Sequence, residues 1–183
     1  LQLAAVVVRE SGFQYLLSVL PMFILMGNFV THSGLSRQLY KAAYSFLGHH
    51  KGGLALSTIV ACGGFGAACG SSLATAATMS KVAYPEMRRM RYSKALSSGS
   101  IAAGGTLGIL IPPSIVMVVY AILTEQSVGK MFIAGILPGI VLGCGLMAAI
   151  YVRARMVNLP RLPRASFAEV MVAGRDSLWG LLL

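Results

Sequence analysis

Two long uncharged stretches of this chain are each interrupted in the middle by small residues, and this feature most narrows the choice of fold. The first stretch has a glycine-rich cluster at residues 63–70, and the second has one at 104–108, followed by Pro112 and Pro113. Glycine and proline both weaken helices. At membrane depth, non-helical backbone persists only inside protein or beside a water-filled cavity. The pattern therefore predicts helices broken at a functional site, as in secondary transporters, where half-helix ends face ions and substrates.

Composition supports a membrane protein. Hydrophobic residues make up 56% of the 183 residues, charged residues only 11%, and the mean hydropathy is +0.76. A soluble domain carries about 25% charged residues. The chain begins at Leu1 without a signal-peptide pattern and ends within an apolar run, so we expect a piece of a longer protein. The net charge of +10 comes from basic residues in short loops, which favours membrane topology over a nucleic-acid partner.

Loop charge predicts an all-α polytopic membrane protein. The loops on both sides of residues 52–80 are strongly basic, so both are expected in the cytoplasm. A single crossing would put them on opposite sides, whereas a re-entrant hairpin keeps them together. The predicted segments are a first span and basic cytoplasmic loop at 1–51, the re-entrant hairpin at 52–80, a basic loop and broken helix at 81–130, a transmembrane helix at 131–152, and a basic loop leading into an amphipathic or truncated membrane segment at 153–183.

Hydroxyl residues stand at both interruptions. Ser71, Ser72 and Thr75 follow the first glycine cluster, where they are expected either to cap the next helix or, in addition, to ligate a small cation. Pro112 and Ser114 mark either a simple proline kink or an unwound stretch followed by a new half-helix. Oxygen ligands of this kind suit a hard cation such as Na⁺.

Other chemistry finds little support in the sequence. Gly135, Gly139 and Gly143 keep the four-residue spacing that lets membrane helices approach closely, which predicts packing. Three cysteines lie in apolar segments without a paired spacing. No nucleophile motif, paired carboxylates or metal-ligand spacing is present, so we predict no enzyme activity and no cofactor. Glu125 is the acid closest to the second break, and the simpler interpretation is a solvated loop residue.

The ordered motifs resemble one family. They are Gly52-Gly53-Leu54-Ala55, Ala61-Cys62, Gly70-Ser71-Ser72-Leu73-Ala74-Thr75-Ala76-Ala77-Thr78-Met79, Pro85-Glu86-Met87, Ala102-Ala103-Gly104-Gly105-Thr106-Leu107-Gly108-Ile109-Leu110-Ile111-Pro112-Pro113-Ser114, Leu123-Thr124-Glu125-Gln126-Ser127 and Ala134-Gly135-Ile136-Leu137-Pro138-Gly139. Together they resemble the large membrane subunit of TRAP (tripartite ATP-independent periplasmic) transporters, from about residue 20 to residue 158.

The resemblance implies one repeat of an elevator-type secondary transporter in a bacterial inner membrane. Such a subunit works with a small membrane subunit and a periplasmic binding protein, uses Na⁺ as coupling ion, and imports organic acids such as C4-dicarboxylates, sugar acids or keto acids. It further implies an ion and substrate region at Gly70, Ser71, Ser72, Thr75, Gly105, Thr106, Gly108, Pro112 and Ser114. Within that region the Na⁺ candidates are Ser71, Ser72, Gly105 and Thr106.

Two positions depart from the family pattern. Cys69 stands where a serine is expected, and Ala121 where glycine often follows the tyrosine. Two other classes remain open at this point. A non-transporting assembly or scaffold subunit would use the same glycines only for packing. An ion channel would also need carbonyl-lined breaks, but it would conduct without a periplasmic partner.

Overall fold

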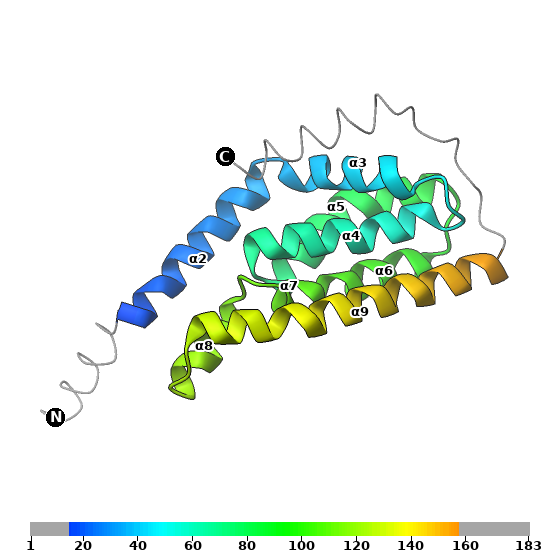
Figure 1. The fold of residues 1–183 in the computed structure, drawn as a ribbon. Coiled ribbons are helices and arrows are strands. Elements are labelled where there is room, and N and C mark those ends of the chain that lie inside the picture. Colours follow the sequence, from blue (N-terminus) through cyan, green and yellow to red (C-terminus); the bar gives the residue numbers. More distant parts are fainter. Residues whose placement is uncertain (1–14, 158–183) are drawn as a thin grey trace, which may run out of the picture.

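The computed structural model describes residues 15–157, and each regular element in that range is a helix (Figure 1). In chain order the helices are α2 (Tyr15–His32), α3 (Leu35–Leu47), α4 (Gly53–Cys69), α5 (Ser72–Arg89), α6 (Lys94–Gly105), α7 (Leu107–Leu110), α8 (Ile115–Leu123) and α9 (Val128–Met156). The predicted all-α class is confirmed for this part of the chain. Helix α4 lies at the centre and contacts α2, α3, α5, α6, α7 and α9.

Helices α4 and α5 form an antiparallel hairpin that reverses at Gly70 (Figure 1). Gly70 has φ +62°, and its N–H donates to the carbonyl oxygen of Gly66 at 2.7 Å. A left-handed glycine at this place ends an α-helix with little strain. The next residue, Ser71, is extended and its hydroxyl accepts from the N–H of Ala74 at 3.4 Å, which caps α5. Two residues therefore suffice to turn the chain.

The second uncharged stretch is interrupted twice. Helix α6 ends at Gly105, the short α7 follows Thr106, and residues 111–114 separate α7 from α8. The peptide bond between Pro112 and Pro113 is cis. The direction of the α6–α7 segment differs from that of α8 by 42°. Because a proline kink alone interrupts a helix once, the structure favours the broken-helix interpretation over the kink.

The core centres on α4 because this helix is apolar on all sides. Leu54, Ala55, Ile59, Cys62 and Phe65 are each at most 2% exposed. Small residues let the neighbouring helices approach. A Cβ added at Gly104 of α6 would lie 2.9 Å from the Sγ of Cys62, which shows how closely the two helices pack.

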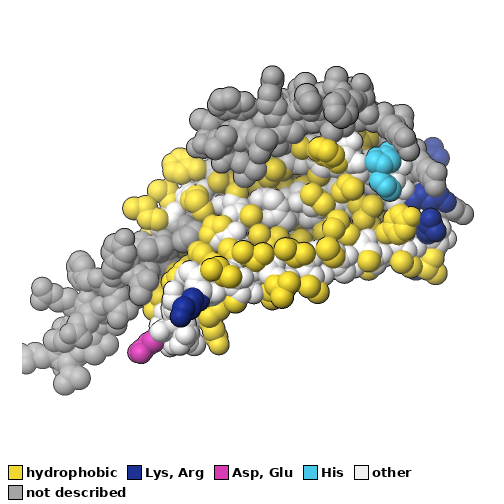
Figure 2. Space-filling view, in the orientation of Figure 1, with side chains coloured by type: hydrophobic (Ala, Val, Ile, Leu, Met, Phe, Trp, Pro, Cys, Tyr) yellow, Lys and Arg dark blue, Asp and Glu magenta, His cyan; other side chains and the backbone are white. Residues whose placement is uncertain are grey.

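Helix α9 is the one described helix that is long and apolar enough by itself to cross a membrane. Its 29 residues extend about 43 Å at the usual rise per residue, against a hydrocarbon core of roughly 30 Å. The pair formed by α6–α7 and α8 satisfies the same test as one bent span. Hydrophobic side chains cover much of the visible face along α9 (Figure 2). Those exposed on α9 include Ile133, Ile136, Leu137, Ile140 and Val141.

The glycines of α9 pack as predicted. Cβ atoms added at Gly135 and Gly139 would meet the carbonyl oxygen of Leu110 at 2.9 Å and the side chain of Ile111 at 3.1 Å. Gly143 lies opposite Leu107, with an ordinary contact distance of 3.9 Å. The spacing therefore serves the packing of α9 against the broken helix.

Three segments differ from the sequence analysis or lie beyond it. Residues 35–47, expected as part of a basic loop, form α3, because their apolar side chains recur on one face and pack against α4. Helix α5 continues to Arg89 instead of ending near residue 80, and Pro85 lies within it. Residues 153–156 of the predicted final segment at 153–183 belong to α9, and the part of it from residue 158 onward lies outside the described residues.

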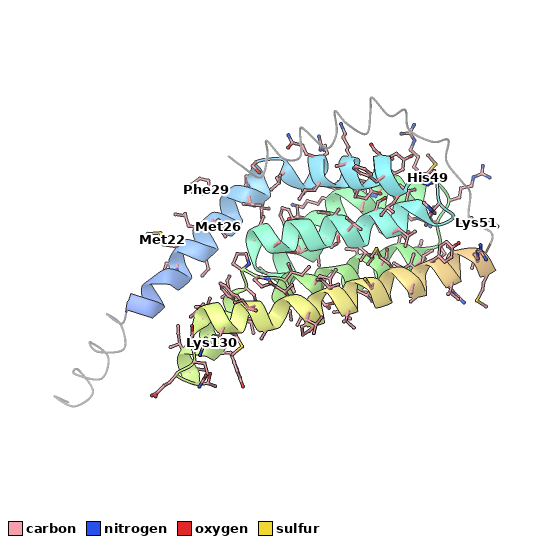
Figure 3. The ribbon with its side chains drawn as sticks, in the orientation of Figure 1. Met22, Met26, Phe29, His49, Lys51 and Lys130 are labelled. Atoms are coloured by element: carbon pink, nitrogen blue, oxygen red, sulfur yellow. The ribbon has the colours of Figure 1, made fainter. Side chains whose placement is uncertain are left out.

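Basic residues gather mainly at one end of the bundle. His49 and Lys51 lie at the end where α3 meets α4, and Lys130 lies near the opposite end, at the start of α9 (Figure 3). The first end also carries Arg88 and Arg89 in the last turn of α5 and Arg91 just after it, close in sequence to the fully buried Tyr92. Burial raises the pKa of the Tyr92 phenol, so this side chain stays neutral among the cations. We call this region the basic end.

Candidate functional site

The tip of the α4–α5 hairpin touches the break before α8. The N–H of Ile115 donates to the carbonyl oxygen of Gly70 at 3.4 Å. A Cβ added at Gly70 would lie only 2.7 Å from the carbonyl oxygen of Pro113. The two interruptions, about 40 residues apart in sequence, therefore meet in direct backbone contact. We call this meeting point the tip–break junction.

A second contact joins the same elements deeper in the bundle. A Cβ added at Gly66 would lie 2.6 Å from the Cα of Gly108. On its other side, Gly108 faces α5, since an added Cβ would lie 2.9 Å from the Oγ1 of Thr75 and 3.0 Å from the carbonyl oxygen of Ser71. The absence of a side chain at Gly108 thus brings polar oxygens up to the backbone of the broken helix.

The end of α6 completes the junction. A Cβ added at Gly105 would lie 2.9 Å from the Cβ of Ala76 and 3.3 Å from the carbonyl oxygen of Ser72. Ser72, one of the predicted ligands, therefore approaches the broken helix through its backbone carbonyl oxygen. Its side chain is half-buried.

Two hydroxyls of the junction are fully buried. Thr75 donates to the carbonyl oxygen of Ser71 at 2.7 Å, and its Oγ1 also lies 3.2 Å from the Sγ of Cys69. The Oγ of Ser114 is buried without a hydrogen-bond partner among the described residues. A buried hydroxyl left unpaired costs roughly 1–3 kcal/mol. Ser114 is thus the polar atom of the junction that most needs a ligand or a water molecule.

Two predicted residues lie away from this convergence. Thr106 is exposed, and its hydroxyl donates to the carbonyl oxygen of Ala103 at 2.6 Å, which closes the end of α6. Pro112 lines an apolar groove of about 280 Å³ against α9, together with Leu107 and Ile140. The structure therefore groups Gly70, Ser71, Ser72, Thr75, Gly105, Gly108 and Ser114, and places the side chains of Thr106 and Pro112 elsewhere.

Helix α2 contributes residues that the sequence analysis did not consider. A cavity of about 250 Å³ lies between α2 and the hairpin tip, lined by Asn28, Thr31, Cys69 and Ser71 among others. Gly27 permits this approach, since an added Cβ would lie 3.2 Å from the carbonyl oxygen of Cys69. A usable signal was present: Asn28 and Thr31 are polar, three positions apart, and therefore on one face of an otherwise apolar helix.

The polar atoms that converge at the tip–break junction are mainly oxygens. Among residues 15–157, no three His, Cys, Asp or Glu side chains gather as a metal site. Carbonyl and hydroxyl oxygens dominate instead, and these ligands suit hard, weakly held cations such as Na⁺. The amino ends of α5 and α8 both begin at the junction, where the helix dipoles favour negative charge. The arrangement can therefore accommodate a cation near the carbonyls and an anionic group near the amides.

A helical bundle with one membrane-length helix, one broken helix and a hairpin tip against the break is consistent with a helical membrane protein. The family model described as "Tripartite ATP-independent periplasmic transporter, DctM component" matches residues 2–183. The chain belongs to this family.

Curated relatives agree. The chain is 48% identical over 179 residues to the C4-dicarboxylate TRAP transporter large permease protein DctM of Pseudomonas aeruginosa, covering 98% of this chain and 42% of the relative. It is 39% identical to the ectoine TRAP transporter large permease protein TeaC of Halomonas elongata (90% and 39%) and 33% identical to the sialic acid TRAP transporter permease protein SiaT of Haemophilus influenzae (91% and 27%). The chain thus spans less than half the length of each. These relatives are transporter permeases rather than enzymes.

Proposed function

We propose that this chain forms one repeat of the large membrane subunit of a Na⁺-coupled secondary transporter for organic acids. The observation that carries the proposal is the tip–break junction, where Gly70 and Gly108 bring the two interruptions into backbone contact. In secondary transporters, paired interruptions of this kind hold the coupling ion and the substrate near the bilayer midplane. The family membership adds the transport class.

In the proposed mechanism, Na⁺ binds among the oxygens of the junction and orders the hairpin tip. The ligands we propose are the candidates Ser71, Ser72 and Gly105, with the buried hydroxyl of Ser114 as an additional oxygen. Thr106 contributes at most its backbone carbonyl, because its exposed hydroxyl donates to Ala103. The carboxylate of the substrate lies near the amino ends of α5 and α8, where helix dipoles favour an anion. The hairpin and broken helix then carry both across the membrane as one elevator domain, driven by the Na⁺ gradient.

The proposed topology is multi-pass in a bacterial inner membrane. Positively charged loops favour the cytoplasm, so the basic end is assigned to that side. The hairpin of α4 and α5 then enters and leaves on the cytoplasmic side, with Gly70 at membrane depth. Glu125 and Lys130, at the opposite end, face the periplasm.

The proposed substrate and partners rest on the family membership and not on the geometry of the tip–break junction. The identity of 48% with a C4-dicarboxylate permease makes a dicarboxylate the first substrate to test. The relatives named for ectoine and sialic acid show that permeases of this family differ in substrate. We propose a periplasmic binding protein and a small membrane subunit as partners, as the tripartite family description indicates.

The test is uptake of labelled C4-dicarboxylates, sugar acids and keto acids into liposomes. The liposomes contain the full-length large subunit with its small subunit, and the binding protein is added outside. We expect uptake with an inward Na⁺ gradient and none with a K⁺ gradient of the same size. Equal uptake without Na⁺ would refute the coupling. Normal uptake by a folded variant with bulky residues at both Ser71 and Ser72 would remove the assigned ion site. Ion current without the binding protein would favour a channel.

A further inference from the structure

A second pocket lies far from the hairpin tip, between α3 and the second half of α5. It has a volume of about 420 Å³, and Leu54 at the start of α4 forms part of its floor. Three basic side chains line it: Arg37 and Lys41 from α3, and Lys81 from α5. All three residues are exposed. The transport mechanism proposed above uses none of them.

The charges of this pocket do not balance. Arg37, Lys41 and Lys81 face a single carboxylate, Glu86, and no ion pair with Glu86 occurs among the described residues. Like charges that share one pocket repel, and a bound anion relieves this repulsion. An arginine fork with two ammonium groups is a donor set suited to phosphate oxygens.

Tyr40 also forms part of the pocket wall, with its hydroxyl buried on the protein side. Tyr40 lines the pocket and is 5% exposed, and its hydroxyl has no hydrogen-bond partner of acceptable geometry among residues 15–157. Thr58 lies near this hydroxyl, but its own Oγ1 donates to the carbonyl oxygen of Leu54 at 2.8 Å.

The remaining walls of the pocket are apolar. Leu54, Val82, Pro85 and Met90 line it beside the basic groups. A free phosphate ion would leave this surface in contact with water, whereas a phospholipid would cover it with the glycerol and upper acyl region. The pocket also lies toward the basic end, which the proposed topology assigns to the cytoplasmic side. Basic pockets between membrane helices on that side favour anionic headgroups.

We propose that the pocket between α3 and α5 binds the phosphate headgroup of an anionic phospholipid. Arg37, Lys41 and Lys81 hold the phosphate, Tyr40 lies beneath it, and the acyl chains leave along the apolar wall. The cytoplasmic placement rests on the proposed function, whereas the binding itself does not. A lipid bound here would stabilise the packing of α3 against the hairpin.

The test is lipid retention by the purified full-length permease in an uncharged detergent, measured by native mass spectrometry during titration with phosphatidylglycerol. We expect the triple variant R37Q/K41Q/K81Q to bind phosphatidylglycerol at least roughly tenfold more weakly, since the loss of a single charge-assisted hydrogen bond already costs about that much. The matched control R89Q/K94Q/R153Q removes three exposed charges outside the pocket and should change binding less than about twofold. Glu86→Gln should strengthen binding, because it removes the repelling carboxylate.

Each possible outcome of this experiment has its own interpretation. If the two triple variants weaken binding equally, the lipid responds only to the overall charge of the protein, and the proposal of a specific site in this pocket is refuted. Equal binding of phosphatidylcholine, which has no net charge, would overturn the anionic specificity. If millimolar glycerol phosphate displaces phosphatidylglycerol, the site binds soluble phosphates, and the proposal of a phospholipid ligand is refuted. Because no transport is measured, loss of Na⁺-driven uptake and loss of lipid binding are independent results.

Discussion

Replacing Gly70 by alanine tests whether the hairpin tip is built against the broken helix. Two costs act at this position. An alanine at φ +62° costs about 1–2 kcal/mol, because its Cβ crowds the following carbonyl group. The same Cβ would also lie 2.7 Å from the carbonyl oxygen of Pro113, and overpacking of this kind costs roughly 1–3 kcal/mol. We therefore expect Gly70→Ala to destabilise the fold by roughly 2–5 kcal/mol.

Gly34 provides a matched control. It has φ +78°, yet an added Cβ there would meet no atom within 4 Å. Gly34→Ala should therefore cost only the backbone term of about 1–2 kcal/mol. Both substitutions restrict the unfolded chain equally, so this contribution cancels between them. The difference between the two variants, about 1–3 kcal/mol, isolates the contact between the tip and the break.

The assay is equilibrium unfolding of the full-length permease in mixed micelles, with and without Na⁺. A ligand that binds the folded state stabilises it, so Na⁺ should raise the stability of the parent protein and of Gly34→Ala. Gly70→Ala should lose most of this Na⁺-dependent gain, because the tip no longer fits against Pro113. If both variants lose the same stability and keep the same response to Na⁺, the junction is not a binding site.

Three further substitutions test other contacts, and a fourth, Gly145→Ala, serves as a control. Gly66→Ala should destabilise by roughly 1–2 kcal/mol in the same unfolding assay, because its Cβ meets backbone of the broken helix at 2.6 Å; Gly145→Ala, with nothing within 4 Å, should stabilise by about 1 kcal/mol through helix propensity. Ser114→Ala should leave stability without Na⁺ unchanged or raise it by up to about 1 kcal/mol, yet weaken Na⁺ binding in calorimetry by roughly tenfold; unchanged affinity would exclude this hydroxyl as a ligand. The sulfur of Cys69 lies 3.2 Å from the Oγ1 of Thr75. Cys69→Ser therefore places a harder oxygen beside Thr75 and should raise Na⁺ affinity, measured as a lower Na⁺ concentration for half-maximal uptake.

The sequence contained enough information to locate the breaks. Glycine clusters and a double proline within uncharged stretches predict interruptions locally, and the structure has them at Gly70, Thr106 and Pro112. That these interruptions meet is a tertiary fact. It depends on how the hairpin packs against the broken helix, which no local pattern specifies. The exposed position of the Thr106 side chain was equally invisible, because its hydroxyl bonds within its own helix turn.

Helix α3 was missed for a different reason. Loop charge was used to place residues 37–51 on one side of the membrane, and charge says nothing about secondary structure. The apolar residues Leu35, Leu39 and Tyr40 recur at helical spacing within that segment, so periodicity would have found it. The contribution of α2 to the tip was lost similarly, since Asn28 and Thr31 were treated as part of a uniform span.

The glycines of the junction connect packing to chemistry. A Cβ at Gly105 or Gly108 would crowd carbonyl oxygens of the hairpin, at 3.3 Å from that of Ser72 and 3.0 Å from that of Ser71. Because no side chain intervenes, those oxygens lie directly against the broken helix. Neutral carbonyls bind Na⁺ weakly enough for release, whereas carboxylates at the same place would hold it. Under the proposed Na⁺ coupling, a packing requirement and the requirement for reversible ion binding select the same residue, so alanine at either glycine should impair stability and Na⁺ affinity together.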